Sequence, residues 1–178
     1  MSMAGINSSH ATAATLTIRR ATSADITTIQ HLTSIIWPAT YSSILSRDQI
    51  EYMLELMYSS ESLRRQMEDL HHHFILCYDG DEAVGFASFS DLGENVFKLH
   101  KIYVLPDRQG RGIGRFMIDY IIAEIRQKGA VALDLNVNRQ NPARFFYERL
   151  GFTIIREEDI DIGKGYWMND YVMRKVIR

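Results

Sequence analysis

The sequence has a single cysteine, Cys77, no large excess of charge of either sign and no long hydrophobic run. One thiol excludes an internal disulfide, and its place in the apolar run 74–78 predicts a buried strand residue in a reducing compartment. The net charge of −2 gives no reason to expect a nucleic-acid partner. No apolar run approaches the roughly 18 residues of a membrane span. Residues 1–14 lack the basic and apolar regions of a secretory signal, so we expect a cytoplasmic protein with no membrane partner.

The length and composition fit one globular domain. The chain has 178 residues, of which 46% are hydrophobic, enough to bury a core. We expect a flexible N-terminal tail at 1–14 and a single domain at 15–178. Hydrophobic periodicity predicts strands at 16–20, 73–78, 83–90, 96–105, 131–137, 152–160 and 166–176. Helices are predicted at about 22–36, 46–57, 60–70, 113–128 and from 141 onward, with Trp37-Pro38 ending the first.

The most informative segment is 102–114, where an apolar strand ends at Pro106 and glycines at 110, 112 and 114 precede an amphipathic stretch. A strand that enters a helix through a glycine-rich turn forms an anion site. Its backbone N–H groups can approach a ligand at the positive end of the helix dipole. Arginines at 108, 111 and 115 add positive charge around the turn. The segment therefore predicts a site for a ligand that carries phosphate.

The glycine spacing excludes two common phosphate-binding motifs. The dinucleotide fingerprint G-x-G-x-x-G, counted from Gly110, would need its last glycine at Arg115. The nucleotide P-loop needs Lys and then Ser or Thr after its final glycine, but Gly114 is followed by Arg115 and Phe116. The remaining pattern is Gln109-x-x-Gly112-x-Gly114.

A second segment, 138–152, predicts a short capped helix. Asn141 is a suitable N-cap, Pro142 suits the first helical position, and Gly151 is a natural stop. Residues 143, 147 and 150 share one face of this helix.

Together the two segments resemble the GNAT superfamily of acetyl-CoA-dependent N-acetyltransferases. Gln109-x-x-Gly112-x-Gly114 resembles the pyrophosphate loop of that family, and 138–152 resembles its Asn-x-x-Ala-x-x-Phe-Tyr-x-x-Leu-Gly-Phe segment. Gln140 stands where the family usually has Asn, which leaves open whether Asn138 or Asn141 meets the coenzyme. The resemblance implies a single α+β domain with a central mixed, mostly antiparallel sheet of about seven strands, flanked by helices and splayed between strands 4 and 5. It also implies acetyl-CoA as the co-substrate and no metal.

The resemblance also implies how the coenzyme is held. The backbone of residues 102–104 would pair with pantetheine, and an amide there, that of Val104, would face the thioester oxygen. The amides of residues 110–115 would cradle the pyrophosphate. The full set expected at the coenzyme is Ile102, Tyr103, Val104, Gln109, Gly110, Arg111, Gly112, Ile113, Gly114, Arg115, Asn138, Asn141, Arg144 and Tyr147.

Transfer to an amine raises two proton problems. An alkyl ammonium has a pKa near ~10.4 and must lose a proton before it attacks, and the departing thiolate needs one. The resemblance implies direct transfer with Tyr147 as the acid. Lys98 aligns with a position where many members have a carboxylate, so we expect the base to be His100, whose imidazole suits proton relay at neutral pH. Glu94, or a water chain with no single base, is the alternative.

Region 37–58 is expected to shape the acceptor site. It combines aromatic residues with carboxylates, and this combination suits a cationic amine. The layout of the region loosely resembles that of bacterial spermidine/spermine acetyltransferases. The alternative is an amphipathic helix with a charged outer face. The acidic run 157–161 predicts a solvated strand end or hairpin, with acceptor binding as the alternative. The segment 163–171 predicts a hairpin into the last strand and could also wall the acceptor pocket. The residues in question in region 37–58 are Trp37, Tyr41, Asp48, Glu51, Tyr52, Glu55 and Tyr58.

Three functions stay open from the sequence. The first is acetylation of a small primary amine such as a polyamine. The second is acetylation of a protein N-terminus or lysine, which an open groove would favour over a closed aromatic pocket. The third is a non-catalytic acyl-CoA-binding module, which the departures at Lys98 and Gln140 keep open. The partner expected is a small-molecule amine, and a homodimer is compatible with the family.

Overall fold

The computed structural model describes residues 15–178, and the tail predicted at 1–14 lies outside the described residues. Seven strands form one sheet in the order β1-β2-β3-β4-β5-β7-β6. Neighbouring strands are antiparallel except β4 and β5, which are parallel. The strands are β1 (Leu16–Arg20), β2 (His73–Asp79), β3 (Glu82–Asp91), β4 (Val96–Val104), β5 (Ala132–Asn138), β6 (Thr153–Gly163) and β7 (Tyr166–Val176).

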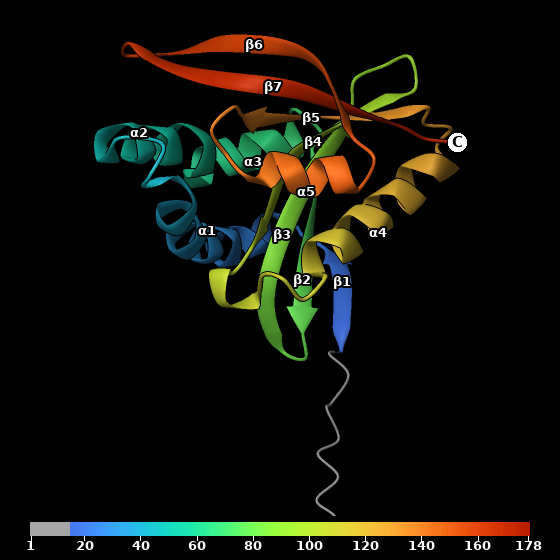
Figure 1. Cartoon of the computed structure of the whole chain (residues 1–178). Helices are drawn as coiled ribbons and strands as arrows, with labels where there is room; N and C mark the ends of the chain where they lie inside the picture. Colours follow the sequence, from blue (N-terminus) through green and yellow to red (C-terminus); the bar gives the residue numbers. More distant parts are fainter. Residues whose placement is uncertain (1–14) are drawn as a thin grey trace, which may run out of the picture.

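Five α-helices flank this sheet within the described residues, and a 3₁₀ turn precedes α1 and another follows β4 (Figure 1). The predicted α+β class, with a mixed and mostly antiparallel sheet of seven strands, is confirmed. The helices are α1 (Ile26–Tyr41), α2 (Arg47–Tyr58), α3 (Ser60–Glu68), α4 (Ile113–Gln127) and α5 (Ala143–Arg149). None of the helices in residues 15–178 has the length and apolar character needed to cross a membrane.

Helix α1 runs past Pro38 to Tyr41, so the predicted end at Trp37-Pro38 is wrong. Proline lacks one N–H donor, and a helix can lose one backbone bond when tertiary packing holds the next turn. Here Trp37 is buried and its ring lies 4.6 Å from that of Tyr41. The extra turn places the Tyr41 hydroxyl against β4, 3.0 Å from the hydroxyl of Tyr103.

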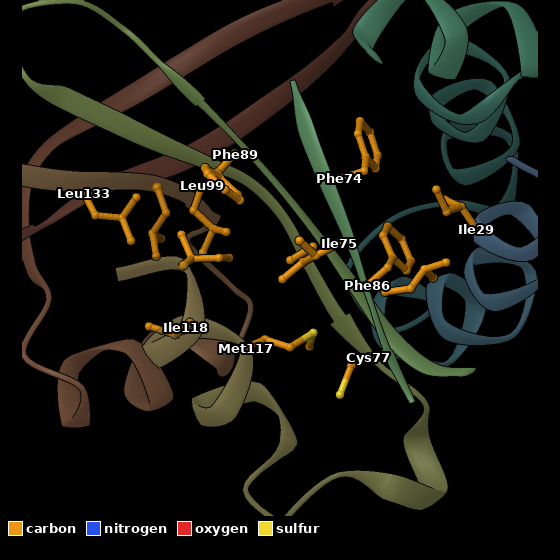
Figure 2. Packing of buried hydrophobic residues seen from close by; sticks show 14 of the residues in the cluster. Ile29, Phe74, Ile75, Cys77, Phe86, Phe89, Leu99, Met117, Ile118 and Leu133 are labelled. Atoms are coloured by element: carbon orange, nitrogen blue, oxygen red, sulfur yellow. The ribbon is translucent and has the colours of Figure 1, made fainter. Parts of the chain in front are cut away.

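The hydrophobic core lies on both faces of the sheet (Figure 2). Met117 and Ile118 of α4 pack on one face, and Ile29 of α1 faces Phe74 and Phe86 on the other. Side chains alternate between the two faces along each strand, which explains the continuous apolar runs of β2 and β3. Cys77 is fully buried in β2, as predicted.

Two irregularities in the sheet position the functional site. The ladder between β4 and β5 extends only from Val96 to Leu99, so the two strands separate beyond that point. At His100, the first residue of this free segment, β4 has a bulge against β3: Ser88 pairs with Lys101 and Phe89 with Leu99, so His100 has no partner in β3. The predicted splay between the fourth and fifth strands is therefore present.

Candidate active site

A cavity of about 770 Å³ opens where β4 and β5 separate. Residues 99–104 of β4 and 135–138 of β5 line its floor, and the glycine loop with the start of α4 lines one end. The other end is lined by residues of α1, α2 and β7. Secondary-structure elements far apart in the sequence thus meet around one space, which is the arrangement expected of a ligand site.

The free edge of β4 offers backbone groups to a ligand. The Leu105 amide donates to Val84 on the β3 side. Because successive amides of a strand point to opposite edges, the Val104 amide faces the splay. The Val104 carbonyl accepts from the Gln109 side-chain amide at 3.1 Å, so Gln109 ties the glycine loop to the end of β4.

The glycine loop leaves the first amides of α4 without protein partners. Gly110 and Gly112 have φ values of +75° and +81°, which glycine adopts without steric cost. Gly112 precedes α4 and no side chain caps that helix. Among the described residues, the amides of 113–115 donate no hydrogen bond. The loop therefore presents N–H groups and a helix N-terminus to an anion.

The three arginines near this loop have different surroundings. Arg108 forms ion pairs with Asp79 at 3.0 Å and with Glu82. Arg115 lies 3.6 Å from Asp119 on the surface of α4. Arg111 forms no ion pair within residues 15–178, and its side chain is not part of the cavity lining. Of the three guanidinium groups, that of Arg111 is therefore the one not already paired with a carboxylate among the described residues, and it is available to a phosphate.

The two candidate asparagines adopt the same local role. The Asn138 side-chain oxygen accepts from the Gln140 amide, and that of Asn141 accepts from the Ala143 amide, both at 2.9 Å. Both asparagines line the cavity. Arg144 does not, because its guanidinium stacks on Phe145 and Tyr171 instead.

Tyrosine side chains from α1, β4 and α5 line the cavity. Tyr147 of α5 is only 8% exposed and lines the cavity with Tyr41 and Tyr103. Burial raises the pKa of each of these three tyrosines. All three hydroxyls therefore hold their protons at neutral pH.

His100 lines the cavity but is a weak base. Its Nε2 atom lies 2.7 Å from the Ser90 hydroxyl, and its ring stacks on that of His72 with centroids 3.9 Å apart. Burial, followed by the nearby charges of His72, Lys101 and Lys98, lowers its pKa to about 3. Glu94 lies in the exposed turn between β3 and β4 and is not part of the cavity lining.

The acceptor features predicted in 37–58 divide into two groups. Trp37, Tyr41 and Tyr58 line the cavity. Tyr52 instead donates a 2.6 Å hydrogen bond to the Ile162 carbonyl of β6. The carboxylates of α2, namely Asp48, Glu51 and Glu55, are absent from the cavity lining.

A buried carboxylate that sequence reasoning did not single out lies in the cavity wall. Asp170 of β7 is 4% exposed, and its Oδ2 atom accepts from the Asn136 side-chain amide at 3.3 Å. The same amide nitrogen donates to Glu158 of β6 at 2.9 Å. Burial raises the pKa of Asp170. The available signal was the acidic run in β6 followed by a lone aspartate in β7, but only strand register shows that the two face one another.

Comparisons with known proteins agree with this geometry. The family model described as Acetyltransferase (GNAT) family matches residues 29–152. The spermidine N(1)-acetyltransferase of Thermoplasma acidophilum is 27% identical over 163 residues, which is 89% of this chain and 95% of that protein. The [ribosomal protein bS18]-alanine N-acetyltransferase of Haemophilus influenzae is 33% identical over 89 residues, 50% of this chain and 57% of that protein.

A solved structure also resembles the whole described fold. The PaiA N-acetyltransferase of Thermoplasma acidophilum, in complex with coenzyme A, has a TM-score of 0.77 and 26% identity, covering 91% of this chain and 99% of that one. The free β4 edge, the unpaired amides and the two left-handed glycines of the present chain fit such a ligand. The chain belongs to the GNAT family of acetyltransferases and is an N-acetyltransferase.

Proposed function

We propose that this protein transfers the acetyl group of acetyl-CoA directly to the primary amine of a small cationic molecule, such as a polyamine. The observation that carries the proposal is one cavity whose lining includes the free edge of β4, the glycine loop, a group of aromatic side chains and Asp170. The spermidine acetyltransferase relative supports the same acceptor class.

The closed acceptor end favours a small amine over a protein substrate. Two contacts join α2 to the β6–β7 hairpin: Tyr52 donates to the Ile162 carbonyl, and the Gln49 side chain donates to the Trp167 carbonyl at 3.1 Å. Figure 1 shows this hairpin extending toward α2. A bound peptide needs an open groove, which these contacts obstruct.

In this proposal, the chain's own residues have three roles in the reaction. The Val104 amide donates to the thioester oxygen as it becomes an oxyanion, and a donor of this kind is worth about 3 kcal/mol. The Tyr147 hydroxyl gives its proton to the departing sulfur. The amides of 113–115 and the charge of Arg111 hold the phosphate end. His100 stays a prediction for the base, although a pKa of about 3 leaves it a poor proton acceptor at neutral pH.

The test is thiol release from acetyl-CoA across a panel of monoamines, diamines, polyamines and peptides that begin with alanine. Continuous release with small cationic amines, and little with peptides, is the expected result. Faster release with peptides would favour a protein acetyltransferase. Tight coenzyme binding without release for any acceptor would contradict both enzymes and favour a binding module.

A further inference from the structure

Asp170 is a charged group without a charged partner. It is only 4% exposed, and no Lys, Arg or His of residues 15–178 forms an ion pair with it. Of its two carboxylate oxygens, Oδ2 accepts from Asn136, and Oδ1 has no donor among the described residues. A buried carboxylate is costly unless it is paired, so this site is suited to a ligand that supplies N–H donors and positive charge.

The register of the sheet directs this carboxylate to the cavity. Asp170 pairs with Asn138 of β5 and with Glu158 of β6, and directly paired residues lie on the same face. Met168, two residues earlier on β7, and Asn136 of β5 are on that face too, and both line the cavity with Asp170 and Asn138. Tyr171, the next residue of β7, faces the other way and packs under Arg144.

Asp170 lines the same cavity as Tyr41, Tyr103 and Tyr147. Burial, and to a smaller extent the charge of Asp170, raises the pKa of Tyr41. The Tyr41 hydroxyl is 3.0 Å from that of Tyr103, which belongs to the free edge of β4. The carboxylate, the tyrosine acid and the strand edge that is expected to hold the thioester thus share one part of the cavity.

Resting on the acetyl transfer proposed above, we infer that the Asp170 carboxylate binds the ammonium group of the acceptor and takes one proton from it before the nitrogen attacks. A C–N bond forms while the C–S bond breaks, and the sulfur keeps the electron pair of that bond. The nitrogen loses two protons in all. One passes through Asp170 to solvent, and the other replaces the proton that Tyr147 gives to the sulfur.

Glu158 of β6 shares the Asn136 amide with Asp170, but its carboxylate lies 3.6 Å from the Arg156 guanidinium and is not part of the cavity lining. Among residues 15–178, Asp170 is therefore the one carboxylate that lines the cavity. A single carboxylate there favours an acceptor with an ammonium group.

The test compares Asp170→Asn with a matched control, Glu157→Gln. Glu157 pairs opposite Tyr171 on the other face of the same hairpin, and its removal subtracts the same charge. We expect Asp170→Asn to lower kcat/KM for the best amine of the panel by about a hundredfold, with an unchanged Kd for CoA and an unchanged Tm. The control should retain wild-type kinetics.

The pH dependence of the rate is a further test, because a purely structural role of Asp170 would not change it. The wild-type rate should fall at acidic pH as Asp170 is protonated. In Asp170→Asn this inflection should disappear, and the rate should instead rise steadily with pH as the fraction of free amine grows. The charged groups that act on Asp170 are Lys98 of β4, Glu158 of β6 and Arg139 after β5, with the Tyr41 hydroxyl of α1 beside it. Loss of the inflection in the Glu157→Gln control would overturn the assignment.

A second variant covers the case in which asparagine is poorly tolerated. Asp170→Ala leaves a space that formate can enter, and added formate should restore part of the rate. Equal kinetics of wild type and Asp170→Asn would overturn the inference, and a loss confined to KM would overturn the proton transfer. Failure of the wild type with every amine would instead contradict the proposed function, so the two failures are distinguishable.

Discussion

Gly114 and Phe146 are in direct contact: a Cβ atom at position 114 would lie 3.1 Å from Cζ of the Phe146 ring. This contact joins the glycine loop at the start of α4 to the short helix α5, which carries Tyr147. Gly114 is therefore needed for close packing of two helices, whereas Gly110 and Gly112 are needed for their backbone conformation.

Replacing Gly114 by alanine should loosen this contact. The half-buried Phe146 ring, which packs against that of Tyr147 at 5.3 Å, must move to accommodate the methyl group. We expect Gly114→Ala to cost about 1 kcal/mol of stability, or roughly 2–4 °C in Tm, and to weaken CoA binding.

The double variant Gly114→Ala with Phe146→Leu should recover Tm, because the smaller side chain makes room for the methyl group. Gly110→Ala is the matched control. Its cost comes from the positive φ and not from a contact, so Phe146→Leu should not relieve it. Equal Tm for Gly114→Ala and wild type would contradict the packing argument.

Two arginines that look alike in the sequence should behave differently. Arg108→Gln removes ion pairs with Asp79 and Glu82 and should lower stability by about 1 kcal/mol. Arg111→Gln should leave stability unchanged and raise the Kd for CoA about fivefold at low salt, which corresponds to roughly 1 kcal/mol.

Salt separates the two effects. The effect of Arg111→Gln should shrink as ionic strength rises, because screening weakens exposed charge pairs. Titration calorimetry at two salt concentrations measures it. A loss of CoA affinity in Arg108→Gln but not in Arg111→Gln would show that the phosphate charges lie elsewhere.

The fold was predictable because its signals are local. Serine caps, apolar periodicity and glycine stops predict where elements begin and end, and Ser46 does cap α2 by accepting from the Gln49 amide. The end of α1 was predicted wrongly at Pro38, because the local cost of proline is outweighed by the packing of Trp37 against Tyr41 and Tyr58. Tyr58 belongs to α2, so part of this packing is a tertiary contact that local propensity does not contain.

The coenzyme end of the site has clearer sequence signals than the acceptor end. The glycine loop and Tyr147 belong to contiguous motifs. Asp170 acquires its surroundings from Asn136 and Glu158 on two other strands, and His100 from a bulge that leaves it unpaired. Neither strand register nor a bulge can be read from one sequence, which explains why α2 carboxylates such as Glu55 were weighed instead.

The buried histidines should make the protein less stable in mild acid. The pKa of His100 in the folded state is about 3, against an ordinary 6.5, so below pH 6.5 the unfolded chain binds a proton that the folded chain does not. Its contribution is complete above pH 6.5 and is lost as the pH falls toward 3. Between pH 6.5 and 5 this amounts to about 2 kcal/mol.

His100→Asn should flatten that dependence, measured as the free energy of unfolding in urea at pH 7.5, 6.5, 5.5 and 5.0. The groups that face His100 are His72, Lys98 and Lys101, with Ser90 as its hydrogen-bond partner. Burial lowers the pKa of His72 to about 4, so part of the slope should remain. The exposed His31 is the control, and an equal flattening in His31→Asn would contradict the assignment.

Tyr147→Phe isolates one hydroxyl of the site. Burial raises the Tyr147 pKa well above its ordinary value, so the hydroxyl holds its proton until a thiolate departs. Removing it should lower kcat by about a hundredfold. The ring contacts with Phe146 and Phe152 at 5.3 and 5.9 Å stay in place, so Tm and the Kd for CoA should not change.

The control for this variant is Tyr120→Phe on α4, which removes a hydroxyl outside the cavity lining. Pre-steady-state release of thiol separates chemistry from product release, because only the chemical step depends on the acid. A leaving thiol of lower pKa needs less protonation, so acetyl thioesters of more acidic thiols should lose less rate in Tyr147→Phe than acetyl-CoA does. An equal loss for all thioesters would mean that Tyr147 positions the substrate and does not donate the proton.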